Sequence, residues 1–411
     1  DACTCADACA RTGPDQAELQ RAAGQVGARL EQFREAVSRL FDQRQRQFTP
    51  PITVFVFKDR VAFTPFKTLY QGKPSEISGY FQASDDAAYI ALATDWQQAD
   101  PYAVIFHEYV HFLVKERLGE LPSWLAEGLG EYYSSCEFPS GGKKITLGKA
   151  IPAHIQNLRR GEFLSLEELF SVNGESPLYN EPGKKNLFYA ESWVLVHYLI
   201  QGSGAKYQPQ LQQLLDSIAI GQSAESAFKR VFQDDLAGLE GELRQYIRRG
   251  IYMAREISFE RKIEFDESMQ ITPLSETETQ TYLGDLLWHI NRRDEGEAVL
   301  QRVLAMEPQL EAANTSLGLL RFRQNRFAEA RKFLRLAIEA NSTNYLAHYY
   351  HAFAWQQEYV DVAGYVSDFP PEVVTGMRAS LNRARELAPE FAGTYKTLAF
   401  INVVQKEKLD E

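Results

Sequence analysis

The sequence predicts an α+β domain with a small mixed or antiparallel sheet, followed by a helical region and an α-helical solenoid. Residues 51–57 and 88–94 are runs of β-branched, aromatic and small apolar residues bounded by charged or turn residues, which favours strands. Residues 102–114, YAVIFHEYVHFLV, are apolar on nearly every side, as in a buried helix. After residue 276, small residues recur at a fixed interval, which indicates stacked helix pairs.

Composition limits the classes of partner. With 411 residues, 45% of them hydrophobic and 12% aromatic, the chain can bury a large core and form two or three domains. Its 55 acidic and 44 basic residues give a net charge of −11, which argues against nucleic acid and anionic membranes as partners. No apolar stretch approaches the roughly 18 residues of a membrane helix, so we expect a soluble chain without a transmembrane segment.

We divide the chain at shifts in its hydrophobic pattern. The expected parts are a cysteine-containing segment at 1–15, an α+β core at 16–150, a helical part at 151–256, a connector at 257–275 and a repeat domain at 276–411. An amphipathic helix within 16–48 is expected to pack on the sheet. Further helices are expected at 154–160, 166–171, 187–200, 208–218 and 237–249, and the connector alternates as an extended segment does.

The four cysteines are unevenly placed. Cys3, Cys5 and Cys9 crowd the N-terminal segment, whereas Cys136 lies in the α+β core. Disulfides, for which four cysteines allow three pairings, would indicate an exported protein, periplasmic or secreted. A small metal clip and a reduced tail are the alternatives.

The apolar helix has clear boundary signals. Asp100 can cap it, Pro101 suits its first turn, and Gly119 follows its last basic residues, so the pattern predicts a helix of about 18 residues.

Two histidines lie on one face of this helix. His107 and His111 are four residues apart, which brings both imidazoles to the same place. A buried carboxylate beside them, Glu108, would be costly without a partner, and a divalent metal ion would supply one. The alternative is two core histidines with a coincidental glutamate.

A third metal ligand is expected in residues 121–135, a second helical pattern that carries Glu127 and Glu131. The HEYVH sequence followed closely by WLAEG at 124–128 resembles the gluzincin zinc metallopeptidases. By that resemblance His107, His111 and Glu127 bind Zn²⁺. Glu131 would then orient a ligand or lie on the surface. Two imidazoles and a carboxylate suit zinc but admit other first-row ions.

The resemblance also implies catalytic roles. Glu108 would act as the general base that takes a proton from the attacking water. Tyr189 resembles the tyrosine that stabilises the oxyanion in aminopeptidase-like gluzincins, although packing in the core is an equal alternative. His154 and His197 are further candidates for that donor. The family places an edge strand before the metal helix, and we assign this edge to residues 88–94, after a turn at 79–81 like that of the peptidase-MA-like branch.

The C-terminal third contains the repeated pattern. Gly284, Gly318 and Ala352 are thirty-four residues apart, as in tetratricopeptide repeats, where small residues let two helices approach closely. An insertion at 365–376 interrupts the third repeat, and Ala399 begins a truncated fourth. The concave face of such an array binds peptides or proteins, so we expect a protein partner there. A generic helical bundle is the alternative.

Three functions fit the sequence. The first is a zinc-dependent metallopeptidase, a hydrolase of peptide or protein substrates, with an appended repeat domain. The second is a peptidase-like scaffold or binding protein that has lost turnover, and the third is a metallohydrolase of non-peptide amides or esters.

Overall fold

The computed structural model describes most of the chain. The described residues are 16–40, 52–70, 72–75, 77, 79–84, 86–93, 101–139, 143–173, 175–180, 182–233, 235–263 and 272–407. Cys3, Cys5, Cys9 and the predicted cap Asp100 lie outside these ranges. Within them, the structure contains no helix that is both long and apolar enough to cross a membrane.

A three-stranded mixed sheet forms the centre of the N-terminal domain. Its strand order is β1 (Ile52–Phe57), β5 (Ala88–Ala93) and β4 (Gly79–Ala83). β5 runs parallel to β1 and antiparallel to β4. The predicted α+β class with a small mixed sheet is therefore confirmed.

The prediction that residues 88–94 form an edge strand was wrong. β5, which corresponds to residues 88–94, is the central strand. The edges are β1 and β4, and at β4 the sequence pattern indicated only a turn at 79–81. All six residues of β5 are buried because helices cover both faces of the sheet. A continuous apolar run such as AYIALA is typical of a strand covered on both faces.

Two helices cover one face of the sheet. The amphipathic helix predicted within 16–48 is α1 (Gln16–Leu40), and the apolar helix is α3 (Pro101–Leu118), which has the predicted 18 residues. Phe33 of α1 stacks on Phe106 of α3 with ring centroids 4.0 Å apart, in the same core as Ile90 of β5. α3 ends where Gly119 adopts a positive φ of 76°, a conformation that glycine takes without strain.

The helical region follows α3. Its helices are α4 (Ser123–Ser134), α5 (Pro152–Leu158), α6 (Leu166–Ser171), α7 (Pro177–Asn180), α8 (Pro182–Gln201), α9 (Gln208–Ala219), α10 (Ala224–Val231) and α11 (Leu236–Arg249). The short helices α7 and α10 were not predicted. The region also contains an unpredicted antiparallel pair, β6 (Lys144–Leu147) with β7 (Arg255–Ser258), so the domain boundary proposed at residue 256 falls inside β7.

α8 is the central helix of this region. Residues 190–200 are all buried, and the helix is apolar on every side. α4 approaches it closely at Gly128, where an added Cβ would lie 2.4 Å from the carbonyl oxygen of Ser192. This contact fixes the position of α4, which carries Glu127.

The C-terminal domain consists of antiparallel helices. They are α12 (Glu276–His289), α13 (Arg293–Met306), α14 (Glu311–Arg323), α15 (Phe327–Glu339), α16 (Tyr345–Glu358), α17 (Pro371–Leu387) and α18 (Ala392–Gln405). Gly284 faces Leu300, and Gly318 faces Leu334. A Cβ added at Gly318 would lie 2.6 Å from Leu334, so no larger side chain fits there. The insertion expected at 365–376 is shorter, because Pro371 begins α17 instead of interrupting it.

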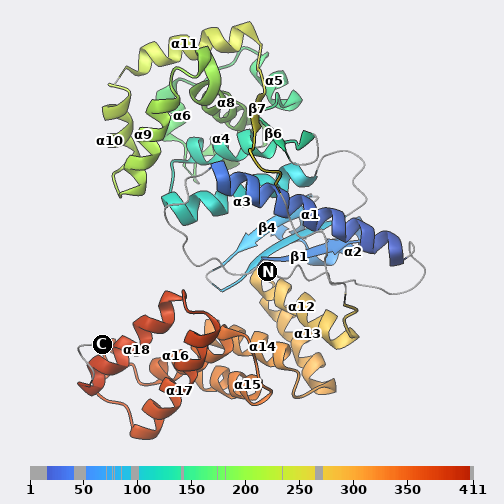
Figure 1. Cartoon of the computed structure of the whole chain (residues 1–411), viewed down its shortest axis with the longest axis vertical. Helices are drawn as coiled ribbons and strands as arrows, with labels where there is room; N and C mark the ends of the chain where they lie inside the picture. The colour runs from blue at the N-terminus through green and yellow to red at the C-terminus, as the bar shows by residue number, and fades with distance from the viewer. Residues whose placement is uncertain are drawn as a thin grey trace.

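The C-terminal helices cover the second face of the sheet. Leu283, Leu286 and Leu287 of α12 form one core with Phe55 of β1 and Tyr89 of β5. Figure 1 shows the sheet between the helical region, drawn in green, and the C-terminal helices, drawn in orange and red. The two halves of the chain are therefore in direct contact.

Candidate metal centre

Three predicted ligands meet where α3 and α4 pack together. His107 Nε2 lies 2.9 Å from His111 Nε2 and 3.0 Å from Glu127 Oε2, and His111 Nε2 lies 3.4 Å from the same oxygen. His107 and Glu127 are buried and His111 is partly exposed, so this group is reached by solvent from the His111 side. These three residues could hold a metal ion.

The spacing of the donor atoms fits a small divalent cation. Zinc bonds of about 2.0–2.2 Å in tetrahedral geometry would place neighbouring ligand atoms roughly 3.3 Å apart. The three observed separations, 2.9, 3.0 and 3.4 Å, are close to that value. Two facing imidazole nitrogens and a carboxylate oxygen therefore already surround a point at which a metal ion could bind.

A glycine on α4 makes room for the first ligand. A Cβ added at Gly130 would lie 2.8 Å from Cε1 and 2.9 Å from Nδ1 of His107. Glycine inside a helix costs about 1 kcal/mol relative to alanine, so its presence needs a reason. The reason here is that the imidazole of His107 lies directly against the α4 backbone.

Glu131 contacts the far side of the same imidazole. Its carboxylate lies 3.6 Å from His107 Nδ1 and 3.1 Å from His154 Nε2, and its side chain is only 17% exposed. A carboxylate on the second nitrogen of a ligating histidine fixes the ring orientation and its tautomer. Glu131 is therefore partly buried beside His107 and does not lie on the open surface.

A second tyrosine, which the sequence did not reveal, holds the carboxylate ligand. Tyr179 of α7 donates a hydrogen bond of 2.6 Å from its hydroxyl to Glu127 Oε1. Because Oε1 is occupied in this way, Oε2 is the oxygen that faces the two histidines. Tyr179 thus orients Glu127 toward the candidate metal position.

Tyr189 also lies beside the three ligands. Its ring is nearly parallel to that of His107, with centroids 6.1 Å apart and planes inclined by 16°. Burial raises the pKa of its hydroxyl well above the usual value, as do the charge of Glu127 and hydrogen bonding with Tyr179 and Glu127. The ammonium of Lys185 lies 5.0 Å from the Tyr189 ring centroid and 5.8 Å from that of Tyr179. Tyr189 therefore stays a neutral hydrogen-bond donor next to the ligands.

The other two histidine candidates have structural partners. His154 contacts Glu131 and so lies behind His107. His197 is fully buried and bonds to Gly148 O at 3.0 Å and to the Tyr246 hydroxyl at 2.9 Å. Burial lowers the pKa of His197 to about 4, so its ring is neutral near pH 7. Neither Gly148 nor Tyr246 belongs to the group of His107, His111 and Glu127.

Carboxylates dominate the electrostatics of the site. Burial opposes ionisation of Glu127, yet its hydrogen bonds with His107 and His111 hold its pKa well below the usual value. Burial also disfavours a charge on His107, but the hydrogen bond with Glu127 and the neighbouring carboxylate charges outweigh it and raise its pKa to about 8. Glu108, partly buried on α3, is one of those charges. An excess of negative charge of this kind favours a cation.

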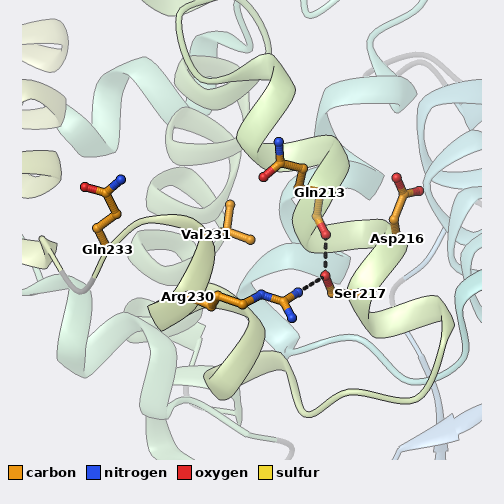
Figure 2. A pocket seen from close by; sticks show the side chains of 6 residues that line it. All are labelled: Gln213, Asp216, Ser217, Arg230, Val231 and Gln233. Carbon is orange, nitrogen blue, oxygen red and sulfur yellow. Dashed lines mark hydrogen bonds between the residues drawn. The ribbon is translucent and has the colours of Figure 1, made fainter.

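A hollow between α9 and α10 lies apart from the candidate metal centre. It is lined by Gln213, Asp216, Ser217, Arg230, Val231 and Gln233 (Figure 2). Arg230 donates a 2.5 Å hydrogen bond to the Ser217 hydroxyl, which in turn donates to the carbonyl of Gln213 at 2.6 Å. No predicted catalytic or ligand residue lines it, so the metal centre is the stronger candidate site.

Sequence reasoning missed Tyr179 and Gly130 for different reasons. Tyr179 lies in a four-residue helix, which is too short to give a periodic signal. Gly130 did give a signal, because two glycines at 128 and 130 inside one helical pattern are unfavourable unless close packing requires them.

Comparison with known proteins identifies the family of this part of the chain. Residues 33–249, which include α3, α4, α7 and α8, match the family model described as the Peptidase MA superfamily. No curated protein matches the chain.

Proposed function

Since the chain belongs to the Peptidase MA superfamily, we propose that it is a zinc-dependent metallopeptidase that hydrolyses peptide bonds. The observation that supports this most directly is the convergence of His107, His111 and Glu127 within hydrogen-bond distances of one another. Two imidazoles and one carboxylate are a donor set of catalytic zinc sites, which keep a fourth position for water or substrate.

The proposed roles follow from the positions of the side chains. His107, His111 and Glu127 would hold the ion, Tyr179 would orient Glu127, and Glu131 would orient His107. A bound zinc ion supplies Lewis acidity and lowers the pKa of water to about 7. Glu108, one residue from His107 on α3, would accept the proton from the attacking water.

Tyr189 is proposed to stabilise the developing oxyanion. It stays protonated, and its ring lies beside His107, so its hydroxyl is available as a neutral donor near the reacting centre. Tyr179, whose hydroxyl donates to Glu127, would position that carboxylate and would not contact the oxyanion.

The edge strand β4 is proposed to pair with the substrate backbone. Among the described residues β4 pairs with β5 alone, and its Phe81 packs on Tyr109 and Phe112 of the metal helix, with centroids 6.1 and 5.4 Å away. Backbone pairing of this kind binds peptides with little regard to sequence.

The test is hydrolysis of a mixed-peptide pool by the zinc-loaded protein. We expect cleavage that a chelator abolishes, no cleavage by Glu108→Gln at an unchanged zinc content, and loss of zinc in His111→Ala. Zinc binding without cleavage of any peptide would favour a scaffold that has lost turnover. Cleavage of amides or esters without peptide cleavage would favour the metallohydrolase alternative.

We further propose that α12–α18 form tetratricopeptide repeats that contact a protein partner. The positions of Gly284 and Gly318 against the following helices support the repeat pattern. Pull-down with the full chain and with a surface variant of the repeats would test the partner.

Export is also a proposal, based on the cysteines. Cys136 is buried, at 4% exposed, and the other three lie outside the described residues. Mass spectrometry of the non-reduced protein would establish whether Cys136 is joined to one of them.

A further inference from the structure

A buried carboxylate connects the sheet to the C-terminal helices. Asp86 lies in the turn between β4 and β5, and its side chain is only 1% exposed. Its Oδ1 lies 3.2 Å from Arg323 Nη2 of α14 and 3.8 Å from His289 Nε2 of α12. Two helices of the C-terminal domain therefore place basic groups against one carboxylate of the N-terminal domain.

The turn is shaped to present this carboxylate. Ser84 donates a hydrogen bond of 2.6 Å to Asp86 Oδ1 and closes the turn through a backbone bond of 2.8 Å to Ala87 O. Burial opposes the charge of Asp86, but His289 and Arg323 outweigh that effect and hold its pKa well below the usual value. Asp86 is therefore an ionised group, and its opposite charges come from the other domain.

The next polar contact is at Tyr89, three residues further along the chain. Its hydroxyl donates to Asp285 Oδ2 of α12 and lies 3.2 Å from His289 Nδ1. Asp285 also accepts hydrogen bonds from Trp288 Nε1, at 3.0 Å, and from the hydroxyl of Ser316 on α14. The polar groups of α12 and α14 are thus arranged around the start of β5, where Tyr89 lies.

Apolar packing surrounds this polar cluster. Leu283, Leu286 and Leu287 of α12, with Ile290 just after it, share a core with Phe55, Phe57, Phe63 and Tyr80 of the N-terminal domain. The guanidinium of Arg292 donates to the carbonyl oxygens of Pro65 and Lys67, the latter at 3.4 Å. Both kinds of contact join the C-terminal helices to the N-terminal domain.

We propose that α12 and α14 form a docking surface whose resident ligand is the chain's own β4–β5 turn, with Asp86 as the recognised carboxylate. The docked turn holds β4 and β5 in place. Since Phe81 of β4 packs on α3, this contact positions the strand that lies against the metal helix. A protein partner of the repeats would bind outside this occupied surface.

Amide hydrogen exchange of the full-length, metal-free chain tests the docking without any assay of hydrolysis. In Arg323→Gln, the buried charge of Asp86 loses its nearest cation, and a buried charge without its partner is strongly unfavourable. We expect the amides of β4 and β5 to exchange at least tenfold faster than in the wild type, with exchange in α8 unchanged.

A matched control lies within the repeats. Arg331 of α15 pairs with Glu358 of α16 at 3.0 Å, and this pair lies within the C-terminal domain. Arg331→Gln removes a comparable arginine pair from the same domain, so exchange in β4 and β5 should not change.

A second variant separates recognition of the carboxylate from simple packing by Arg323. Asp86→Asn in the Arg323→Gln background removes the unpaired charge and should restore most of the lost protection. Unchanged exchange of β4 and β5 in Arg323→Gln, or equal acceleration in the single and double variants, would overturn the proposal.

Discussion

The imidazole of His107 lies directly against Gly130, so that a Cβ at that position would be 2.8 Å from the ring. Replacing Gly130 by alanine should displace the imidazole, because the new Cβ would overlap the ring. The displacement would disturb the contacts of the two ring nitrogens with Glu127 and Glu131. We expect zinc affinity to fall at least tenfold, as measured by competition with a chelator of known affinity.

Gly241 on α11 is the matched control, because nothing lies within 4 Å of a Cβ added there. Gly241→Ala should leave zinc affinity unchanged and stabilise the protein by up to about 1 kcal/mol, since alanine is the better helix former. Equal zinc affinity in both variants would show that the ring can relax without harm to the site.

The two carboxylates of α4 should differ when each is replaced by alanine. Glu127→Ala removes the oxygen nearest both histidine Nε2 atoms and should abolish stoichiometric zinc. Glu131→Ala leaves the three ligands in place and should weaken zinc binding by about 10–100-fold. Elemental analysis with a zinc titration measures both. Stoichiometric, tight zinc in Glu127→Ala would remove that residue from the ligand set.

The two tyrosines should also separate by their kinetic effects. Tyr189→Phe removes the proposed oxyanion donor, so kcat should fall by about 10²–10³-fold with little change in KM. Tyr179→Phe removes the 2.6 Å bond to Glu127 and should mainly weaken zinc binding. Steady-state kinetics at saturating zinc, together with zinc titration, distinguish the two. An unchanged kcat in Tyr189→Phe would reduce that residue to packing.

A buried carboxylate away from the ligands should make stability depend on pH. Burial raises the pKa of Glu191 from 4.5 to about 7, although the backbone N–H of Leu164 donates to it at 2.9 Å. The folded pKa of Glu191 is higher than the unfolded one, so the folded state holds its proton more tightly. The stability that comes from the neutral carboxyl is therefore fully present below pH 4.5 and is lost as pH rises through 7.

Glu191→Gln keeps an acceptor for Leu164 but carries no charge. It should be more stable than the wild type at pH 8, by up to about 3 kcal/mol, with the difference falling below about 1 kcal/mol near pH 5. Urea unfolding at both values measures this. Glu162→Gln, at an exposed position, should stay within about 0.5 kcal/mol of the wild type at both. An equal difference at pH 5 and pH 8 would show that the Glu191 charge is not its cause.

The ligand group could be predicted because its information is local. His107 and His111 are one helical turn apart, and the apolar residues around them already indicate a buried helix. Glu127 follows on the next helix after a short connection, so few arrangements could separate it from them.

The order of the strands required long-range information. β4 and β5 are adjacent in sequence and similar in length, and only the packing of α12 on the second face explains why β5 is central and fully buried. The sequence contains no signal for this, because α12 lies almost two hundred residues further along the chain.

By itself the sequence determined the helical positions of His107, Glu108, His111 and Glu127, since helical periodicity and end signals act over a few residues. The tertiary structure alone decided that Tyr179 orients Glu127, that Gly130 receives the His107 ring, and that Asp86 is buried among the C-terminal helices. These contacts join residues distant in the chain, and only the packing of whole helices and strands brings them together.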